Sequence, residues 1–254
     1  MIPPAAENGI RQAGAVLRSA RHAVVLTGAG ISTPSGIPDF RSQNTGLWEH
    51  DDPMQVASLT AFRRRPEVFF NWLRPLAQKI WLAEPNPAHL GLAEMEKAGL
   101  LQATITQNID GLHQAAGAQT VLELHGSART ATCFPCRKTY STEAFRQPFL
   151  DGGIPRCPKC NSILKPDIVL FEEQLPTDVW NEASWHCDEA DVMLVVGSSL
   201  EVTPAAGLPY SAVANGAHLI INTISRTYLD NRADVLLPFD VAEVIPLIFQ
   251  AAVA

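Results

Sequence analysis

Four cysteines arranged in two pairs offer the ligand set of a structural metal site. Two residues lie between the cysteines of each pair and twenty separate the pairs, which are Cys133 with Cys136 and Cys157 with Cys160. Two tight turns that each present two thiolates form the tetrahedral set that Zn²⁺ prefers, and four thiolates leave no open position for substrate. The alternative, a pair of disulfides, requires an oxidising compartment. We therefore expect one structural zinc ion per chain.

A glycine-rich segment, Gly28-Ala29-Gly30-Ile31-Ser32, directly follows the apolar run His22–Thr27. After a buried strand, such a turn lets backbone N–H groups approach a pyrophosphate. The third glycine of the dinucleotide fingerprint is absent, so a plain tight turn is the alternative. Further along, Arg41 is suited to hold a phosphate with two hydrogen bonds, and Phe40 to cover a flat ring. The alternative there is a surface loop with one buried phenylalanine.

Polar side chains also follow the other apolar runs. Gln107, Asn108 and Asp110 come after Ala103–Thr106, and Gly197 to Ser199 come after Val192–Val196. The carboxyl ends of parallel strands border the ligand crevice of doubly wound sheets, so we expect these groups to meet in one site. Asp110 is also suited to begin the next helix as its N-cap, and both roles are compatible.

His125 ends another apolar run, and Asn222 ends the run that begins at His218. A lone histidine is more often structural, but neighbouring strand ends here carry polar groups too. An imidazole with a near-neutral pKa suits general-base catalysis. The amide of Asn222 is expected to reach a ribose hydroxyl.

The elements that must position these residues alternate along the chain. Four short apolar runs indicate buried parallel strands, at His22–Thr27, Ala103–Thr106, Val192–Val196 and His218–Ile221. Helical spacing of apolar residues predicts helices between and around them, at Asn8–Ala20, Ala88–Ala98, Asp178–Glu189, Ala205–Ala214 and Asp240–Ala251. This alternation predicts an α/β fold with a parallel, Rossmann-like sheet covered on both faces.

Two segments interrupt the alternation. Thr33–Glu84 is rich in Pro, Trp and Phe, and Ser127–Lys165 holds the cysteines. We expect both to leave the sheet and to build a second, smaller lobe together.

Composition limits the classes of function. Hydrophobic residues make up 46% and charged residues 18% of the 254, which is typical of a globular protein. The net charge of −7 does not favour nucleic-acid binding, which needs a basic face. No apolar run reaches the roughly 20 residues of a membrane span, and no signal peptide is visible. We expect a cytoplasmic protein without nucleic-acid or membrane partners; the sequence does not indicate the oligomeric state.

Taken together and in this order, these motifs resemble the sirtuin family. The segments that carry the resemblance are Gly28–Ser32, Gly36–Ser42, Thr106–His113, His125-Gly126, the two cysteine pairs and Gly197–Val202, and the similarity runs from about Val24 to Val244. The resemblance implies a large Rossmann-like domain of residues 1–33, 85–126 and 166–254. It also implies a small domain, in which 34–84 form a helical module with a cofactor-binding loop and 127–165 a zinc ribbon.

The resemblance also implies roles for individual residues. His125 is expected to be the general base, with Asn108 and Asp110 as further catalytic residues. The acyl-lysine peptide is expected to lie along Val169, Leu170 and Phe171. The expected NAD contacts are Gly28, Ala29, Gly30, Ile31, Thr33, Asp39, Phe40, Arg41, Gln107, Asn108, Ile109, Asp110, His125, Gly197, Ser198, Ser199, Asn222, Asp240 and Val241.

The implied activity is NAD-dependent protein-lysine deacylation. Loss of nicotinamide makes the ribose carbon positive, the acyl oxygen of the substrate attacks it, and His125 deprotonates a ribose hydroxyl that then takes the acyl group. The products are nicotinamide, O-acyl-ADP-ribose and free lysine. On the same scaffold, the alternatives are NAD hydrolysis and mono-ADP-ribosyl transfer.

Two positions depart from the pattern of the family. Sirtuins usually have Gly where this chain has Glu172, beside the expected peptide site; losing Gly removes backbone freedom and adds a negative charge. Sirtuins that prefer acidic acyl groups carry a Tyr and an Arg where this chain has Phe70 and Leu73. The resemblance therefore implies acetyl or fatty acyl groups rather than succinyl as substrates.

Overall fold

A parallel sheet of six strands forms the centre of the larger lobe. The computed structural model describes residues 4–39, 46 and 51–254. The strand order is β3-β2-β1-β7-β8-β9, and every pairing in this sheet is parallel. The strands are β1 (Ala23–Thr27), β2 (Ala103–Thr106), β3 (Val121–Glu123), β7 (Val192–Val196), β8 (His218–Asn222) and β9 (Val235–Leu237). The predicted α/β class and all four predicted strands are confirmed.

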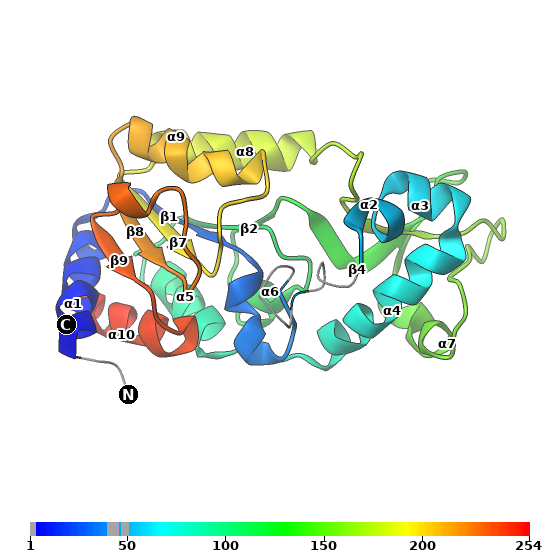
Figure 1. Cartoon of the computed structure of the whole chain (residues 1–254), viewed down its shortest axis with the longest axis horizontal. Coiled ribbons are helices and arrows are strands. Elements are labelled where there is room, and N and C mark those ends of the chain that lie inside the picture. Colours follow the sequence, from blue (N-terminus) through cyan, green and yellow to red (C-terminus); the bar gives the residue numbers. More distant parts are fainter. Residues whose placement is uncertain (1–3, 40–45, 47–50) are drawn as a thin grey trace.

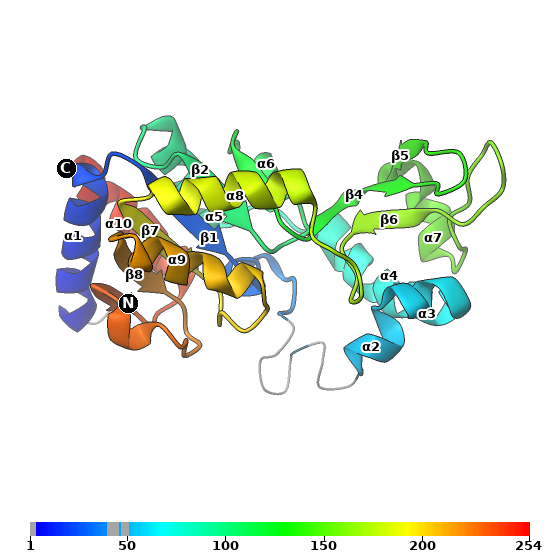
Figure 2. The same ribbon diagram turned by 90° about the horizontal axis from the view of Figure 1, so that it is seen from above.

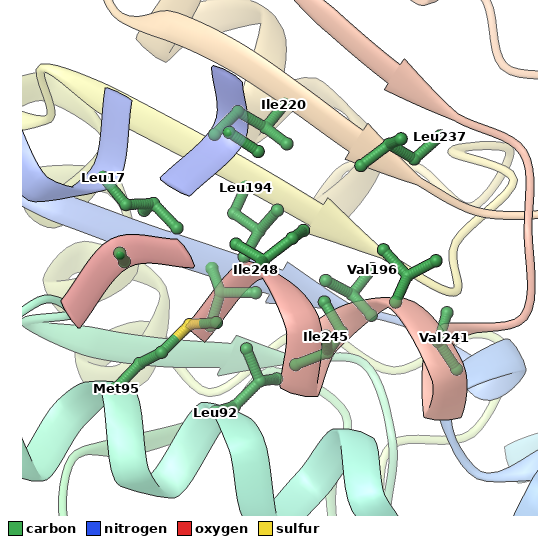
Figure 3. Packing of buried hydrophobic residues seen from close by; sticks show 14 of the residues in the cluster. Leu17, Leu92, Met95, Leu194, Val196, Ile220, Leu237, Val241, Ile245 and Ile248 are labelled. Atoms are coloured by element: carbon green, nitrogen blue, oxygen red, sulfur yellow. The ribbon is translucent and has the colours of Figure 1, made fainter. Parts of the chain in front are cut away.

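Helices cover both faces of this sheet (Figure 1). On one face lie α1 (Pro4–Ser19), α5 (Pro87–Lys97) and α10 (Val241–Val253), and on the other α8 (Thr177–Glu189) and α9 (Leu208–Ala214). Alternate residues of one strand serve opposite faces, which explains the uninterrupted apolar runs. Leu194 and Val196 pack toward α10 (Figure 3), whereas Met193 and Val195 belong to the core under α8.

One predicted helix is divided. Residues 205–214 form a short 3₁₀ turn, Ala205–Gly207, followed by α9. Pro209 stands in the first turn of α9. Backbone N–H groups in a first turn have no acceptor within the helix, so proline costs no hydrogen bond there, and its fixed φ suits a helix start. The predicted helices at the other four places are present within a few residues of their expected ends.

The smaller lobe lies at the opposite end of the molecule from α1 and α10 (Figure 2). Its antiparallel sheet has the order β5-β4-β6. Its elements are α2 (Pro53–Val56), α3 (Leu59–Arg64), α4 (Pro66–Leu82), β4 (Gly126–Thr132), β5 (Thr139–Ser141), α7 (Arg146–Leu150) and β6 (Lys165–Ile168). Residues 166–168, which the sequence-based boundary gives to the large domain, thus pair within the small sheet.

The two segments that leave the large sheet share one aromatic core. Phe70 of α4 meets Phe149 of α7 edge-on, with ring centroids 5.9 Å apart, and Trp81 meets the same ring at 5.8 Å. Such edge-to-face pairs add to the free energy gained by burying the rings. None of the helices in the described residues is long and apolar enough to cross a membrane.

Candidate active site

The carboxyl ends of the parallel strands border a cavity of about 1290 Å³ between the two lobes. Parallel strands end at the same edge of a sheet, so segments far apart in sequence meet there. Of the predicted site residues, those that line the cavity are Gly28, Ala29, Gly30, Thr33, Asp39, Gln107, Asn108, Ile109, Asp110, His125, Val169, Leu170, Phe171, Gly197, Ser198, Ser199, Asp240 and Val241.

His125 follows β3 and is held by the neighbouring strand. Its Nδ1 lies 2.9 Å from the backbone oxygen of Gln107. A carbonyl oxygen only accepts hydrogen bonds, so Nδ1 carries the proton and Nε2 of the neutral ring keeps its lone pair. Burial lowers the pKa of His125, and the hydrogen bond to Gln107 offsets this only in part. The ring is therefore neutral near pH 7 and able to accept a proton.

The same residue is tied to the predicted peptide site. The backbone N–H of Val169 donates to the backbone oxygen of His125 at 2.7 Å. Through this bond the segment that follows β6 is fixed next to the imidazole. This bond fixes the distance between the imidazole and the predicted peptide site before any ligand binds.

Ser32 of the glycine-rich turn contacts the catalytic candidates Asn108 and Asp110, which follow β2. Its hydroxyl donates to Asp110 Oδ2 at 2.7 Å and accepts from the Asn108 side-chain amide at 3.1 Å. The Asn108 amide also donates to the backbone oxygen of Gly28 at 3.1 Å. Sequence reasoning missed Ser32 as a site residue, although it stands in the quoted turn, because its partners lie 76 and 78 positions away.

Asp110 accepts a second hydrogen bond, from the backbone N–H of Leu112 at 2.9 Å. The N-cap of α6 (Leu112–Ala115) is Gly111, so the N-cap position expected for Asp110 is wrong by one residue. Asp110 stands just before the cap and still accepts the first N–H of the helix. Burial raises the pKa of Asp110, while hydrogen bonds from Leu112 and Ser32 act in the opposite direction. The carboxyl is thus a buried group whose orientation is fixed before any ligand binds.

The turns after β1 and β7 touch each other. The N–H of Gly30 donates to the backbone oxygen of Gly197 at 2.8 Å. Gly197 has φ 61°, and a Cβ there would lie 2.3 Å from the backbone nitrogen of Ile31. Only glycine fits that position. The Gln107 amide closes the arrangement by donating to the Ser198 hydroxyl at 3.0 Å.

Two predicted NAD contacts among the described residues, Ile31 and Asn222, do not line this cavity. Ile31 is fully buried in the core between α1, α5 and α10. Asn222 is also buried, and its amide donates to the backbone oxygens of Leu237 and Phe239, at 2.8 and 3.0 Å. Its Oδ1 is buried without a hydrogen-bond partner among the described residues. Phe40 and Arg41 lie outside the described residues.

The cavity fits a dinucleotide together with part of a second substrate. Single small-molecule pockets hold roughly 300–1,000 Å³, so about 1290 Å³ leaves room for more than one ligand. Polar groups of the strand ends line one part. An apolar part is lined by Trp72, Leu73, Leu76, Ile80, Ile168 and Leu170.

The four cysteines form the predicted metal centre. Their sulfur atoms all lie within 4.8 Å of one another, and neighbouring pairs are 3.2 to 3.6 Å apart. Four sulfurs at about 2.3 Å from one Zn²⁺ ion have similar separations, so the residues fit a structural zinc. The two cysteine pairs have the same turn geometry. The N–H of Arg137 donates to the backbone oxygen of Cys133, and the N–H of Asn161 to that of Cys157, both at 2.8 Å. Arg137 and Asn161 both have positive φ.

Comparison with known proteins finds related enzymes over nearly the whole chain. The sequence model of the Sir2 family matches residues 28–204. The NAD-dependent protein deacylase 2 of Archaeoglobus fulgidus is 47% identical over 245 residues, which is 96% of each chain. A solved Sir2 enzyme has a TM-score of 0.90 and 46% identity over 97% of this chain and 98% of that chain. Sir2Af2, solved with a myristoylated histone peptide, has a TM-score of 0.83 and 41% identity over 97% of both chains.

Proposed function

The chain belongs to the Sir2 family, and we propose that it removes acyl groups from lysine side chains of proteins in an NAD-dependent reaction with His125 as general base. NAD is a co-substrate: it supplies the ribose to which the acyl group is transferred. One water molecule is consumed, and the products are nicotinamide, O-acyl-ADP-ribose and free lysine. The observation that carries the proposal is His125 in the wall of the cavity, with Nδ1 engaged by Gln107 and Nε2 left to accept a proton.

His125 takes the proton of a ribose hydroxyl, which makes that oxygen nucleophilic toward the acyl carbon. Its lowered pKa keeps the imidazole in the neutral form that this step requires. Asn108 and Asp110 hold the ribose in place; their orientation is set in advance by Ser32. A site ordered before binding avoids the cost of ordering these side chains when the substrate arrives.

The acyl group occupies the apolar part of the cavity. Leu73 and Leu170 line it, whereas Phe70 is buried in the core beneath. Among the described lining residues the one arginine or lysine is Arg226, which follows β8 in the large sheet. A succinyl carboxylate placed against these apolar side chains would lose hydration without gaining a cation. Acetyl and longer fatty acyl groups fit instead.

The resemblance of the chain to deacylases over nearly its whole length favours deacylation over NAD hydrolysis or ADP-ribosyl transfer. Glu172, which stands where the family usually has Gly, accepts a hydrogen bond from the Thr60 backbone at 2.8 Å. Its carboxylate is thus already engaged on the rim.

A panel of lysine-acylated peptides tests the proposal, with NAD and product detection by mass. We expect nicotinamide release only with an acylated peptide, one O-acyl-ADP-ribose per free lysine, and higher kcat/KM for acetyl and myristoyl than for succinyl. Equal nicotinamide release without peptide would instead show an NAD hydrolase. A preference for succinyl would overturn the assignment of the apolar part.

A further inference from the structure

The segment after β6 makes a tight turn in which Glu172 takes an unfavourable backbone conformation. The N–H of Glu173 donates to the backbone oxygen of Leu170 at 3.0 Å, which closes a four-residue turn. Glu172 is the third residue and has φ 74°. A positive φ at this position is the reason why turns of this kind favour glycine there. A residue other than glycine keeps such a strained backbone conformation only when surrounding contacts hold it, and such residues are often found at functional sites.

The side chain of Glu172 attaches the turn to the helical module. Its Oε2 accepts the backbone N–H of Thr60, in the first turn of α3, at 2.8 Å. Hydrogen bonds from the side chain and backbone of Thr60 lower the pKa of Glu172, and Arg63 and Arg64 add to the effect. The group is therefore a carboxylate at neutral pH, placed at a helix N-terminus where negative charge is stabilised.

Backbone contacts bring the same two segments together. The N–H of Phe171 donates to the oxygen of Ala57 at 3.1 Å, and the N–H of Leu59 donates to the oxygen of Phe171 at 3.0 Å. These two bonds exist for any residue at position 172. The Glu172 bond is the one that depends on its side chain, so substitution there isolates its contribution.

The two ends of the turn, Leu170 and Glu173, are held by a separate set of contacts. The carboxylate of Glu173 accepts the N–H of Leu170 at 2.9 Å and pairs with Lys165 Nζ at 2.8 Å. Lys165 is buried and also donates to the backbone oxygen of Ile168 at 2.7 Å. The ends of the turn are thus held by Lys165 of β6 in the small sheet. Glu172, in the middle of the turn, binds a different element, α3.

We propose that Glu172 is a positioning residue that pins the substrate turn, residues 170–173, to α3 before the acylated peptide binds. Ala57, Phe171 and Glu172 all line the cavity, so this contact shapes the wall beside which the peptide is expected to lie. The inference rests on the proposed function. It gives the negative charge of Glu172 a role within the chain, as the acceptor of a hydrogen bond from α3. A turn ordered in advance binds peptide more tightly because less ordering remains to be done.

Three substitutions separate the effects of strain, charge and hydrogen bonding. Glu172→Gly relieves the backbone strain and removes the acceptor, Glu172→Ala keeps the strain and removes the acceptor, and Glu172→Gln keeps an acceptor oxygen without the charge. We expect KM for an acetyl-lysine peptide to rise about fivefold in the Gly and Ala variants. We expect KM for NAD and kcat to stay within about twofold. The Gln variant should raise the peptide KM less than the Gly and Ala variants do, because its neutral oxygen still accepts the bond but more weakly than a carboxylate. Glu94→Ala, which removes an exposed carboxylate of α5, is the matched control.

Hydrogen exchange of the ligand-free proteins gives a readout that needs no activity. We expect the amides of Leu59, Thr60 and Phe171 to exchange faster in Glu172→Gly than in the wild type, and unchanged exchange in Glu94→Ala. Unchanged exchange in Glu172→Gly, or a peptide KM no higher than that of the wild type, overturns the proposal. A wild-type protein without deacylase activity overturns the proposed function, while the exchange result still decides whether the turn is pinned.

Discussion

The chemistry of a single residue, His125, depends on which ring nitrogen keeps its lone pair. The Gln107 carbonyl fixes the proton on Nδ1, so the nitrogen that accepts a proton is determined by the fold. Burial of the ring favours its uncharged form, and a base must be uncharged to act. Both features exist in the ligand-free protein.

We expect the His125 imidazole to titrate below pH 6.5 in the ligand-free protein. Its pKa is lowered by burial, so the ring stays neutral as the pH falls through 6.5 and becomes protonated only at lower pH. NMR titration of the ring protons measures this, and the His125→Ala variant assigns the signal by its loss. A midpoint above 6.5 would contradict the burial seen here.

At the residue scale, the sequence predicts most of the residues that line the site but not the hydrogen bonds that join them. His125 and Asp110 could be predicted because each follows an apolar run that forms a strand. The role of Ser32 could not, because it depends on hydrogen bonds to residues more than seventy positions away. The buried amide of Asn222, which binds the oxygens of Leu237 and Phe239, depends on a strand that the sequence did not reveal.

At the scale of elements, that strand is β9. It has three residues, and its middle residue Leu236 is exposed, so it lacks the long apolar run that marks the central strands. The central strands can be predicted from the sequence because helices bury both of their faces (Figure 1). Edge strands lack this double burial, and their pattern is correspondingly weak.

The contact between the β1 and β7 turns gives a prediction at this scale. Gly197→Ala places a Cβ 2.3 Å from the Ile31 nitrogen, so the two turns must separate. We expect the free energy of unfolding to fall by about 3 kcal/mol or more and KM for NAD to rise. Gly99→Ala is the matched control, because Gly99 also has positive φ but nothing lies within 4 Å of the added atom. Strain alone costs about 1 kcal/mol there, and equal losses in denaturant melts would refute the close-contact explanation.

The cysteine centre gives a second prediction for the small sheet. Cys157→Ser removes one of four zinc ligands, so we expect loss of bound zinc, unfolding of β4 to β6 and loss of activity. Metal analysis and circular dichroism check this. Cys187→Ala is the control, because Cys187 is buried in the core under α8 and its replacement leaves zinc binding intact. A folded Cys157→Ser protein that is active without zinc would contradict a structural metal.

At the scale of the whole molecule, the active site is the junction of two lobes. The two lobes lie toward opposite ends of the molecule (Figures 1 and 2). The large sheet contributes the strand-end groups proposed to bind NAD, and the small lobe contributes apolar side chains such as Leu73 of α4. Neither lobe alone encloses the cavity. The hydrogen bond between Val169 and His125 lies where the two lobes meet, so the proposed base and the proposed peptide segment are positioned together.

We propose that this junction holds NAD and an acylated lysine with His125 between them. The most direct test measures NAD binding and deacylation in the wild type and in His125→Ala, with His218→Ala, an exposed histidine, as control. We predict that His125→Ala binds NAD within about threefold of the wild type but deacylates about 10²- to 10⁴-fold more slowly, while His218→Ala is unaffected. Deacylation by His125→Ala at close to the wild-type rate would contradict the account.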